Sequence, residues 1–206
     1  MNAAPDRMSS EDRRAQIIAA AAEVFGERGY AGGTTDAIAR QAGISQAYVV
    51  RMFGTKEKLF SEVGEKGSTA VIAAFRDAIA GFPEGASDID KQSMLGLAYT
   101  QLIEDRGLLL SLLQLFSQGH DPVLGKQART CFLDVYRVVR DEAGLGPRLA
   151  TEFFSRGMLI TVLMAMRMPD AVGDLDAAQL LTTALGPAEP VLLEIMSRPP
   201  LPDARR

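Results

Sequence analysis

The chain has 206 residues, of which 47% are apolar and 23% are charged. These proportions are typical of a globular protein and exclude a disordered or fibrous chain. The longest strongly apolar stretches, residues 107–116 and 157–166, are far shorter than the roughly 20 residues that a membrane-spanning helix needs, so no membrane is predicted as a partner. The N-terminus carries Asp6, Glu11 and Asp12 and lacks an apolar core segment, so it does not resemble a signal peptide, and the single Cys131 cannot form an internal disulfide. The sequence therefore predicts a cytoplasmic protein.

The formal net charge of −4 is unevenly distributed along the chain. Residues 1–60 contain eight Lys or Arg and seven Asp or Glu, whereas the remainder contains fourteen and nineteen. The acidic excess thus lies in the C-terminal part, and the N-terminal part is only weakly basic. Composition alone would not identify a nucleic-acid-binding protein.

In the N-terminal part, the sequence predicts an arm over residues 1–8 and then four helices. The first follows a cap at Ser9 or Ser10 and ends at Gly29, with an apolar face of Ile17, Ile18, Ala21, Val24 and Phe25. The second spans residues 35–41 behind Thr34, and the third spans residues 46–52 behind Ser45. The fourth begins near Lys56 and continues to Gly81.

Glycine, proline and aspartate divide the rest of the chain into further helical segments, at residues 91–106, 107–118, 121–143, 147–168 and 174–197. Gly186, Pro187 and Pro190 predict a kink or break in the last one. No segment alternates with the period of a strand, so the predicted fold class is all-α. We expect an N-terminal three-helix helix-turn-helix domain over residues 9–55 and a larger C-terminal helical domain over residues 56–198.

Residues 34–53, TTDAIARQAGISQAYVVRMF, have the pattern of a helix-turn-helix. Gly43 permits the turn, and Ala39 is small enough for the two helices to approach closely. The residues predicted to lock the helices together are Ile38, Ala42, Ile44, Val49 and Phe53. The residues predicted to face outward on the third helix are Gln46, Ala47, Tyr48, Val50, Arg51 and Met52.

This region resembles the TetR family of repressors over about residues 13–63. The matching positions, all at the family's spacing, are Phe25, Gly29, Tyr30, Thr34, Thr35, Ile38, Ala39, Ala42, Gly43, Ile44, Ser45, Val49, Arg51, Phe53, Lys56, Glu57 and Leu59. Beyond residue 65 the similarity is one of length and helical character only.

The resemblance implies roles in DNA binding for the matching positions. Thr35 and Lys56 would contact phosphates, and Gln46, Ala47 and Tyr48 would read bases. The full set of implied DNA-binding residues is Thr34, Thr35, Ser45, Gln46, Ala47, Tyr48, Val50, Arg51, Met52 and Lys56.

Two kinds of exception bear on these roles. Val50 and Met52 stand where the family usually has Tyr and often His, and Asp36 stands where some members have a base-reading Arg. Tyr48 could instead pack on the fourth helix, and Arg51 could pair with Glu57.

The C-terminal part is rich in apolar and aromatic residues that would suit an apolar or aromatic ligand, although most could simply form a core. The residues predicted to line a pocket are Tyr99, Leu102, Leu113, Phe116, His120, Phe132, Tyr136, Phe154 and Met158. The last long helices carry apolar residues on more than one face, which predicts either burial or an oligomer interface. The residues predicted at a dimer interface, by position in the family, are Phe153, Leu159, Val162, Met166, Leu181, Leu185 and Leu192.

The resemblance thus implies a repressor that binds a palindromic double-stranded DNA operator as a homodimer and is released by a small-molecule effector. One alternative is a DNA-binding regulator with no such effector, controlled by a partner protein. Another is a helical enzyme on the same scaffold, but the lone His120 and Cys131 form no recognisable nucleophile and base. We therefore predict no enzyme, no cofactor and no metal site.

Overall fold

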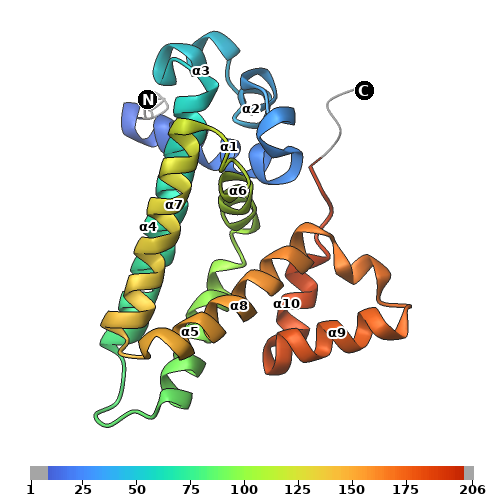
Figure 1. Cartoon of the computed structure of the whole chain (residues 1–206). Helices are drawn as coiled ribbons and strands as arrows, with labels where there is room; N and C mark the ends of the chain where they lie inside the picture. Colours follow the sequence, from blue (N-terminus) through green and yellow to red (C-terminus); the bar gives the residue numbers. More distant parts are fainter. Residues whose placement is uncertain (1–8, 202–206) are drawn as a thin grey trace, which may run out of the picture.

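In the computed structural model, residues 9–201 are described, and every regular element among them is a helix (Figure 1). The all-α prediction, with a small N-terminal domain joined to a larger helical one, is confirmed. The arm predicted for residues 1–8 lies outside the described residues. Within residues 9–201, no helix combines the length and the apolar character needed to cross a membrane.

The N-terminal helices begin at polar caps. Helix α1 (Ser10–Gly32) starts at Ser9, whose hydroxyl oxygen accepts a hydrogen bond from the Asp12 amide at 3.0 Å. The predicted end at Gly29 is partly correct, because Gly29 has a positive φ of 68° but the chain resumes helical turns as far as Gly32. Helices α2 (Thr35–Gln41) and α3 (Gln46–Phe53) begin where predicted, capped by Thr34 and Ser45.

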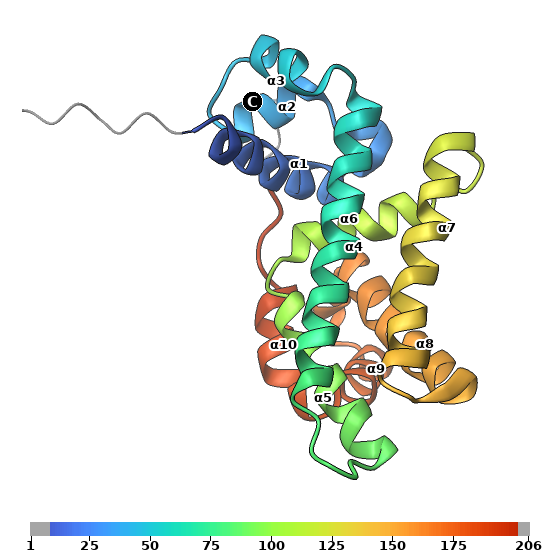
Figure 2. The same cartoon turned by 90° about the vertical axis from the view of Figure 1, so that its left-hand side faces the viewer.

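Four helices form the middle of the chain: α4 (Lys56–Ala80), α5 (Asp88–Leu102), α6 (Arg106–Phe116) and α7 (Pro122–Arg137), the last continued by a π-helical turn over Val138–Glu142. The prediction of a helix over residues 91–106 is corrected to α5. It starts earlier because Ser87 and Asp90 form a capping box. It ends earlier because Asp105 caps the next helix. Helices α4 and α7 run side by side along the length of the molecule (Figures 1 and 2).

The remaining helices are α8 (Gly146–Ala165), α9 (Leu175–Leu185) and α10 (Glu189–Met196), with short 3-10 turns at Met168–Ala171 and Gly186–Ala188. The predicted break in the last segment lies at Gly186, where φ is 58°. Helix α9 folds back against α8 and α10 packs against α9, at the orange and red end of the chain in Figure 1. This return of the chain covers one side of α8 with residues of the same protomer.

Two groups of buried side chains form the core. One lies among α1–α3 and the first half of α4, includes Ile17, Phe25 and Phe60, and extends to Leu115 and Leu124 of α6 and α7. The other fills the space between α4, α5, α6, α8, α9 and α10. The N-terminal domain is therefore not an isolated unit, since it shares its core with helices of the larger domain.

The closest contact between the two domains joins α1 to the start of α6. A Cβ atom on Gly26 would lie 2.9 Å from the Gly107 carbonyl oxygen, and one on Gly107 would lie 2.9 Å from the Glu23 backbone nitrogen. The helices thus meet backbone to backbone. Beside this contact, Arg106 forms a 2.9 Å ion pair with Glu27, and both side chains are largely buried.

We expect Gly107→Ala to lower the free energy of unfolding by about 1–3 kcal/mol, because the new methyl group meets backbone atoms that cannot rotate away. Chemical denaturation followed by circular dichroism measures the change. Gly96→Ala in α5 is the matched control, since a Cβ atom there meets nothing within 4 Å. That variant should be neutral or stabilised by about 0.5–1 kcal/mol. Equal effects of the two substitutions would contradict the close approach of α1 and α6.

Candidate nucleic-acid interface and ligand cavity

Helices α2 and α3 are held at a fixed angle by the N-terminal core. Ile38 of α2 and Val49 of α3 are fully buried, and Phe53 is 5% exposed. Gly43 has a φ of 64° in the turn between the helices, a conformation that favours glycine. As a result, α3 projects at one end of the molecule, at the top of Figure 1, with one side free of other helices.

The exposed side of α3 carries four of the six residues predicted to face outward: Gln46, Ala47, Val50 and Arg51. The prediction is corrected for Tyr48 and Met52, which are half-buried because their side chains pack against the N-terminal core. The Arg51 guanidinium lies over the Tyr48 ring, 4.7 Å from its centroid, and so stacks on Tyr48 rather than forming the ion pair with Glu57 that was considered. The contact with the Tyr48 ring thus holds the Arg51 guanidinium in place.

Gln46 is tied to the start of α2. Its side-chain amide donates to the Thr35 hydroxyl oxygen at 2.9 Å, and the contact lies on the surface. Thr34 and Ser45 each use their hydroxyl oxygens to cap a helix, accepting from the amides of Ala37 and Tyr48. The predicted DNA-binding residues of α2 and α3 therefore form one connected surface.

Two other charged residues near this surface, Asp36 and Lys56, are also held by neighbouring residues. Asp36 forms an ion pair with Arg40 one turn later on α2. The Lys56 ammonium donates to the Tyr30 carbonyl oxygen at 2.9 Å and lies 4.4 Å from the centroid of the Tyr30 ring. Burial, with smaller contributions from Glu57 and Asp121, raises the pKa of Tyr30, so this phenol stays neutral.

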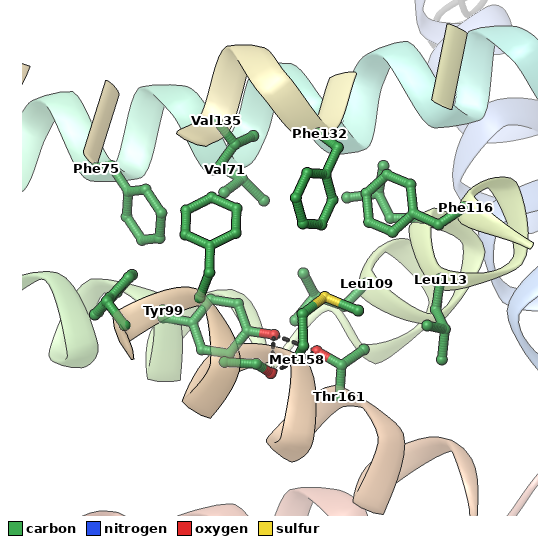
Figure 3. Close-up of a pocket in the computed structure, with 14 residues that line it drawn as sticks. Val71, Phe75, Tyr99, Leu109, Leu113, Phe116, Phe132, Val135, Met158 and Thr161 are labelled. Atoms are coloured by element: carbon green, nitrogen blue, oxygen red, sulfur yellow. Dashed lines mark hydrogen bonds between the residues drawn. The ribbon is translucent and has the colours of Figure 1, made fainter. Parts of the chain in front are cut away.

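The larger domain contains a cavity of about 80 Å³, measured as the space open to the centre of a water molecule, between α4, α5, α6, α7 and α8. Six residues predicted for a pocket line it: Tyr99, Leu113, Phe116, Phe132, Phe154 and Met158 (Figure 3). The residues that line it but were not predicted are Val71, Phe75, Leu109, Leu112, Val135, Phe153, Gly157 and Thr161. Most of these residues lie on apolar helix faces, and the sequence pattern of such faces does not distinguish a cavity wall from a filled core.

Three predicted pocket residues are corrected. Leu102 packs in the core beside the cavity, at the end of α5. His120 is exposed in the turn before α7. Tyr136 packs edge-on against Phe154, with the Arg140 guanidinium 5.3 Å from its ring centroid, and does not line the cavity.

The polar atoms of the cavity wall come from Tyr99, Gly157 and Thr161. The Tyr99 hydroxyl lies 3.2 Å from the Gly157 carbonyl oxygen and is hydrogen-bonded to the Thr161 hydroxyl. Thr161 in turn lies 3.0 Å from the same carbonyl. Burial raises the pKa of Tyr99 to about 12, against a smaller opposing effect of the Thr161 hydrogen bond. Tyr99 is therefore an uncharged phenol throughout the physiological pH range.

The predicted dimer-interface residues separate into two groups. Leu159, Val162 and Met166 of α8 are exposed, Met166 by 60%. The prediction is corrected for Leu181, Leu185 and Leu192, which are 1–3% exposed because α9 and α10 pack against the protomer's own core. It is also corrected for Phe153, which lines the cavity.

Residues 17–63, which contain all of α2 and α3, match the sequence model of the family described as bacterial regulatory proteins, tetR family. Over these residues the chain is similar to the TetR family. It is 32% identical over 74 residues to the HTH-type transcriptional activator FasR of Mycolicibacterium smegmatis, a match that covers 36% of this chain. The chain spans about a third of the length of that relative.

Solved structures of similar fold are also transcriptional regulators. FadR from Bacillus subtilis, in complex with stearoyl-CoA, is 20% identical with a TM-score of 0.59, and the match covers 89% of this chain and 97% of FadR. A TetR-like transcriptional regulator from Rhodococcus sp. RHA1 is 18% identical with a TM-score of 0.57, covering 92% and 96%. Identities this low show the shared fold alone. Helices α2 and α3, which form the helix-turn-helix, lie within the segment that is similar to the TetR family.

The cap at Ser45 fixes where α3 begins and hence which side chains it presents. We expect Ser45→Ala to lower the free energy of unfolding by about 0.5–2 kcal/mol, because the Tyr48 amide loses its hydrogen-bond acceptor. Denaturation by urea measures the change. Ser45→Asn is the matched control, since asparagine caps equally well and should preserve stability. A loss of stability in Ser45→Asn equal to that in Ser45→Ala would contradict the capping role.

Proposed function

We propose that this protein is a TetR-type transcriptional repressor that binds a palindromic DNA operator as a homodimer and is released by a small apolar ligand. The observation that carries the proposal is the exposed side of α3, where Gln46, Ala47 and Arg51 are accessible on a rigidly held helix. A helix fits the major groove of B-form DNA, where side-chain amides pair with adenine and apolar groups contact the thymine methyl.

Around α3, cations suited to phosphate contacts flank the reading residues. Arg51 is exposed at the end of α3, and Lys56 stands at the start of α4. The carboxylate of Asp36 is offset by Arg40, which reduces its repulsion of phosphate. These positions support contacts that fix the protein on the duplex, while Gln46 and Ala47 supply the sequence preference.

The homodimer is supported by the outer side of α8. Leu159, Val162 and Met166 are separated by three and four residues, so they share one face of the helix. Contiguous apolar surface of this kind is typical of a protein–protein interface. A twofold dimer would place two copies of α3 at a fixed separation and so select half-sites about one helical turn apart.

Ligand release is supported by the cavity and its connection to α1. Helix α6 lines the cavity with Leu109, Leu113 and Phe116, and its other side meets α1 at Gly26 and Gly107. A ligand that favours a shifted α6 would move α1 with it, in addition to acting through α4. FadR, which shares the fold, is described in complex with stearoyl-CoA, consistent with a fold that accommodates small molecules. The ligand must favour the released conformer by only a few kcal/mol.

Selection of binding sites from random DNA tests the proposal. We expect Gln46→Ala to change the preferred sequence. We expect Lys56→Gln to weaken binding to all sequences and to lower the magnitude of the slope of log affinity against log salt by about 1.8, which is about 0.9 for each protomer of the dimer. Gel-shift titrations at two salt concentrations measure both effects.

Unfolding curves are the control for these variants, because Lys56 also contacts Tyr30. Identical behaviour of the two variants would contradict the assigned roles. A reporter gene behind the selected site shows the sign of regulation, which matters because FasR is named an activator.

The dimer has its own test. We expect Val162→Glu to raise the dimer dissociation constant by at least tenfold, because a carboxylate would lie buried and unpaired at the centre of the apolar face. Analytical ultracentrifugation measures the dissociation constant. Leu97→Glu is the matched control, since Leu97 is a 62% exposed apolar residue on α5, away from this face. Unchanged self-association of Val162→Glu would place the interface elsewhere.

A further inference from the structure

The cavity combines an apolar wall with one polar cluster. Six of its lining residues are aromatic: Phe75, Tyr99, Phe116, Phe132, Phe153 and Phe154. The rings of Phe116, Phe132 and Phe154 follow one another in edge-to-face contacts with centroids 5.3 Å apart. Figure 3 shows Phe116 and Phe132 along one side and the Tyr99–Thr161 cluster on the other. A planar ring in this cavity would meet ring edges and faces, which aromatic pairs favour.

Counting hydrogens defines what the polar cluster can accept. Tyr99, Thr161 and the Gly157 carbonyl are joined by three contacts, but the two hydroxyl groups supply only two hydrogens. Both hydrogens are therefore used inside the cluster, and the capacity that remains is the lone pairs of the two hydroxyl oxygens. A ligand that donates a hydrogen adds a bond and breaks none. A ligand that only accepts must displace an internal bond.

The charge of the lining points in the same direction. Among residues 9–201, no Lys, Arg or His lines the cavity. An anionic group held there would lose its hydration without gaining a counter-charge, which is strongly unfavourable. Tyr99, with a pKa of about 12, does not ionise to attract a cation.

We propose that the effector of this protein is an uncharged aromatic molecule carrying a hydroxyl group, whose hydrogen is donated to the Tyr99–Thr161 cluster. Its ring lies among Phe116, Phe132 and Phe154. This inference rests on the proposed ligand-binding role of the cavity and adds the chemical class of the ligand. It sets the ligand apart from the acyl-CoA named with FadR, which carries several negative charges.

Three probes with one ring system test the proposal by isothermal titration calorimetry on the full chain. 1-Naphthol has a donor hydroxyl, 1-methoxynaphthalene keeps the oxygen without the hydrogen, and 1-naphthoate is anionic. We expect 1-naphthol to bind about three- to tenfold tighter than the ether, as one added hydrogen bond allows. We expect the naphthoate to bind at least tenfold more weakly than 1-naphthol.

The double variant of Tyr99→Phe and Thr161→Val should remove the preference for 1-naphthol over the ether, because both acceptor oxygens of the cluster are lost. It should leave the affinity for the ether nearly unchanged, because the ring and the cavity remain and no buried hydroxyl donor is left unpaired. Tyr136→Phe is the matched control, since it removes a tyrosine hydroxyl that does not line the cavity. Leu113→Trp, which fills the cavity, should abolish binding of all three probes.

Several outcomes would overturn the proposal: equal binding of 1-naphthol and the ether, tightest binding of the naphthoate, a double variant of Tyr99→Phe and Thr161→Val that keeps the preference, or no binding of any probe to the unaltered chain. The calorimetry contains no DNA. Failure here would therefore leave operator binding and dimerisation, which are measured separately, as they stand.

Discussion

The contact between Gly26 of α1 and Gly107 of α6 is the constraint on which the rest of the arrangement depends. Because backbone meets backbone, there is no flexible side chain between the helices to absorb a displacement. The adjoining Arg106–Glu27 ion pair is largely buried, and Arg106 also donates to the Arg198 carbonyl oxygen at 2.9 Å, near the C-terminal end of the described chain. Helix α6 is thereby fixed to the N-terminal domain on one side while its other side lines the cavity. Helix α6 therefore joins the domain that would read DNA rigidly to the cavity that would hold a ligand.

Much of the N-terminal domain could be predicted from the sequence because its determinants are local. Thr34 and Ser45 cap helices within three residues of themselves, and Gly43 requires no knowledge of distant contacts to be assigned to a turn. The errors arose where tertiary packing decides. Met52 fits the outward face of a helix by spacing alone, but the N-terminal core half-buries it. The start of α5 is an error of another kind, because its determinant is local: the capping box of Ser87 and Asp90 lies in a segment rich in Gly and Asp that resembles a loop.

The cavity and the outer face of α8 were only partly predictable, because periodicity gives the spacing of apolar residues and not what covers them. Helix α8 has apolar residues on several sides: Phe154 faces the cavity, whereas Leu159 faces outward. Leu181 and Leu192 are apolar and are spaced along their helices as interface residues would be. They are nevertheless buried by their own chain, because the positive φ of Gly186 lets α10 fold back. No pattern in the sequence marks Thr161 as a cavity residue. Its importance comes from Tyr99, which is 62 residues away along the chain.

The side chains at the candidate DNA interface are held by one another before any DNA is present, and this bears on recognition. The Gln46 amide group has two hydrogens, of which one is used by Thr35, so its carbonyl oxygen and second hydrogen remain for a base edge. Those are the two groups that pairing with adenine requires. Holding the side chain in place removes part of the rotamer entropy that binding would otherwise cost. Stacking on Tyr48 has the same effect for Arg51, for which we propose a phosphate contact. A valine at position 50 and a methionine at position 52 have no hydrogen-bonding group to offer a base, so in the proposed mode of binding the preorganisation of Gln46 and Arg51 would compensate for the small number of polar groups on α3.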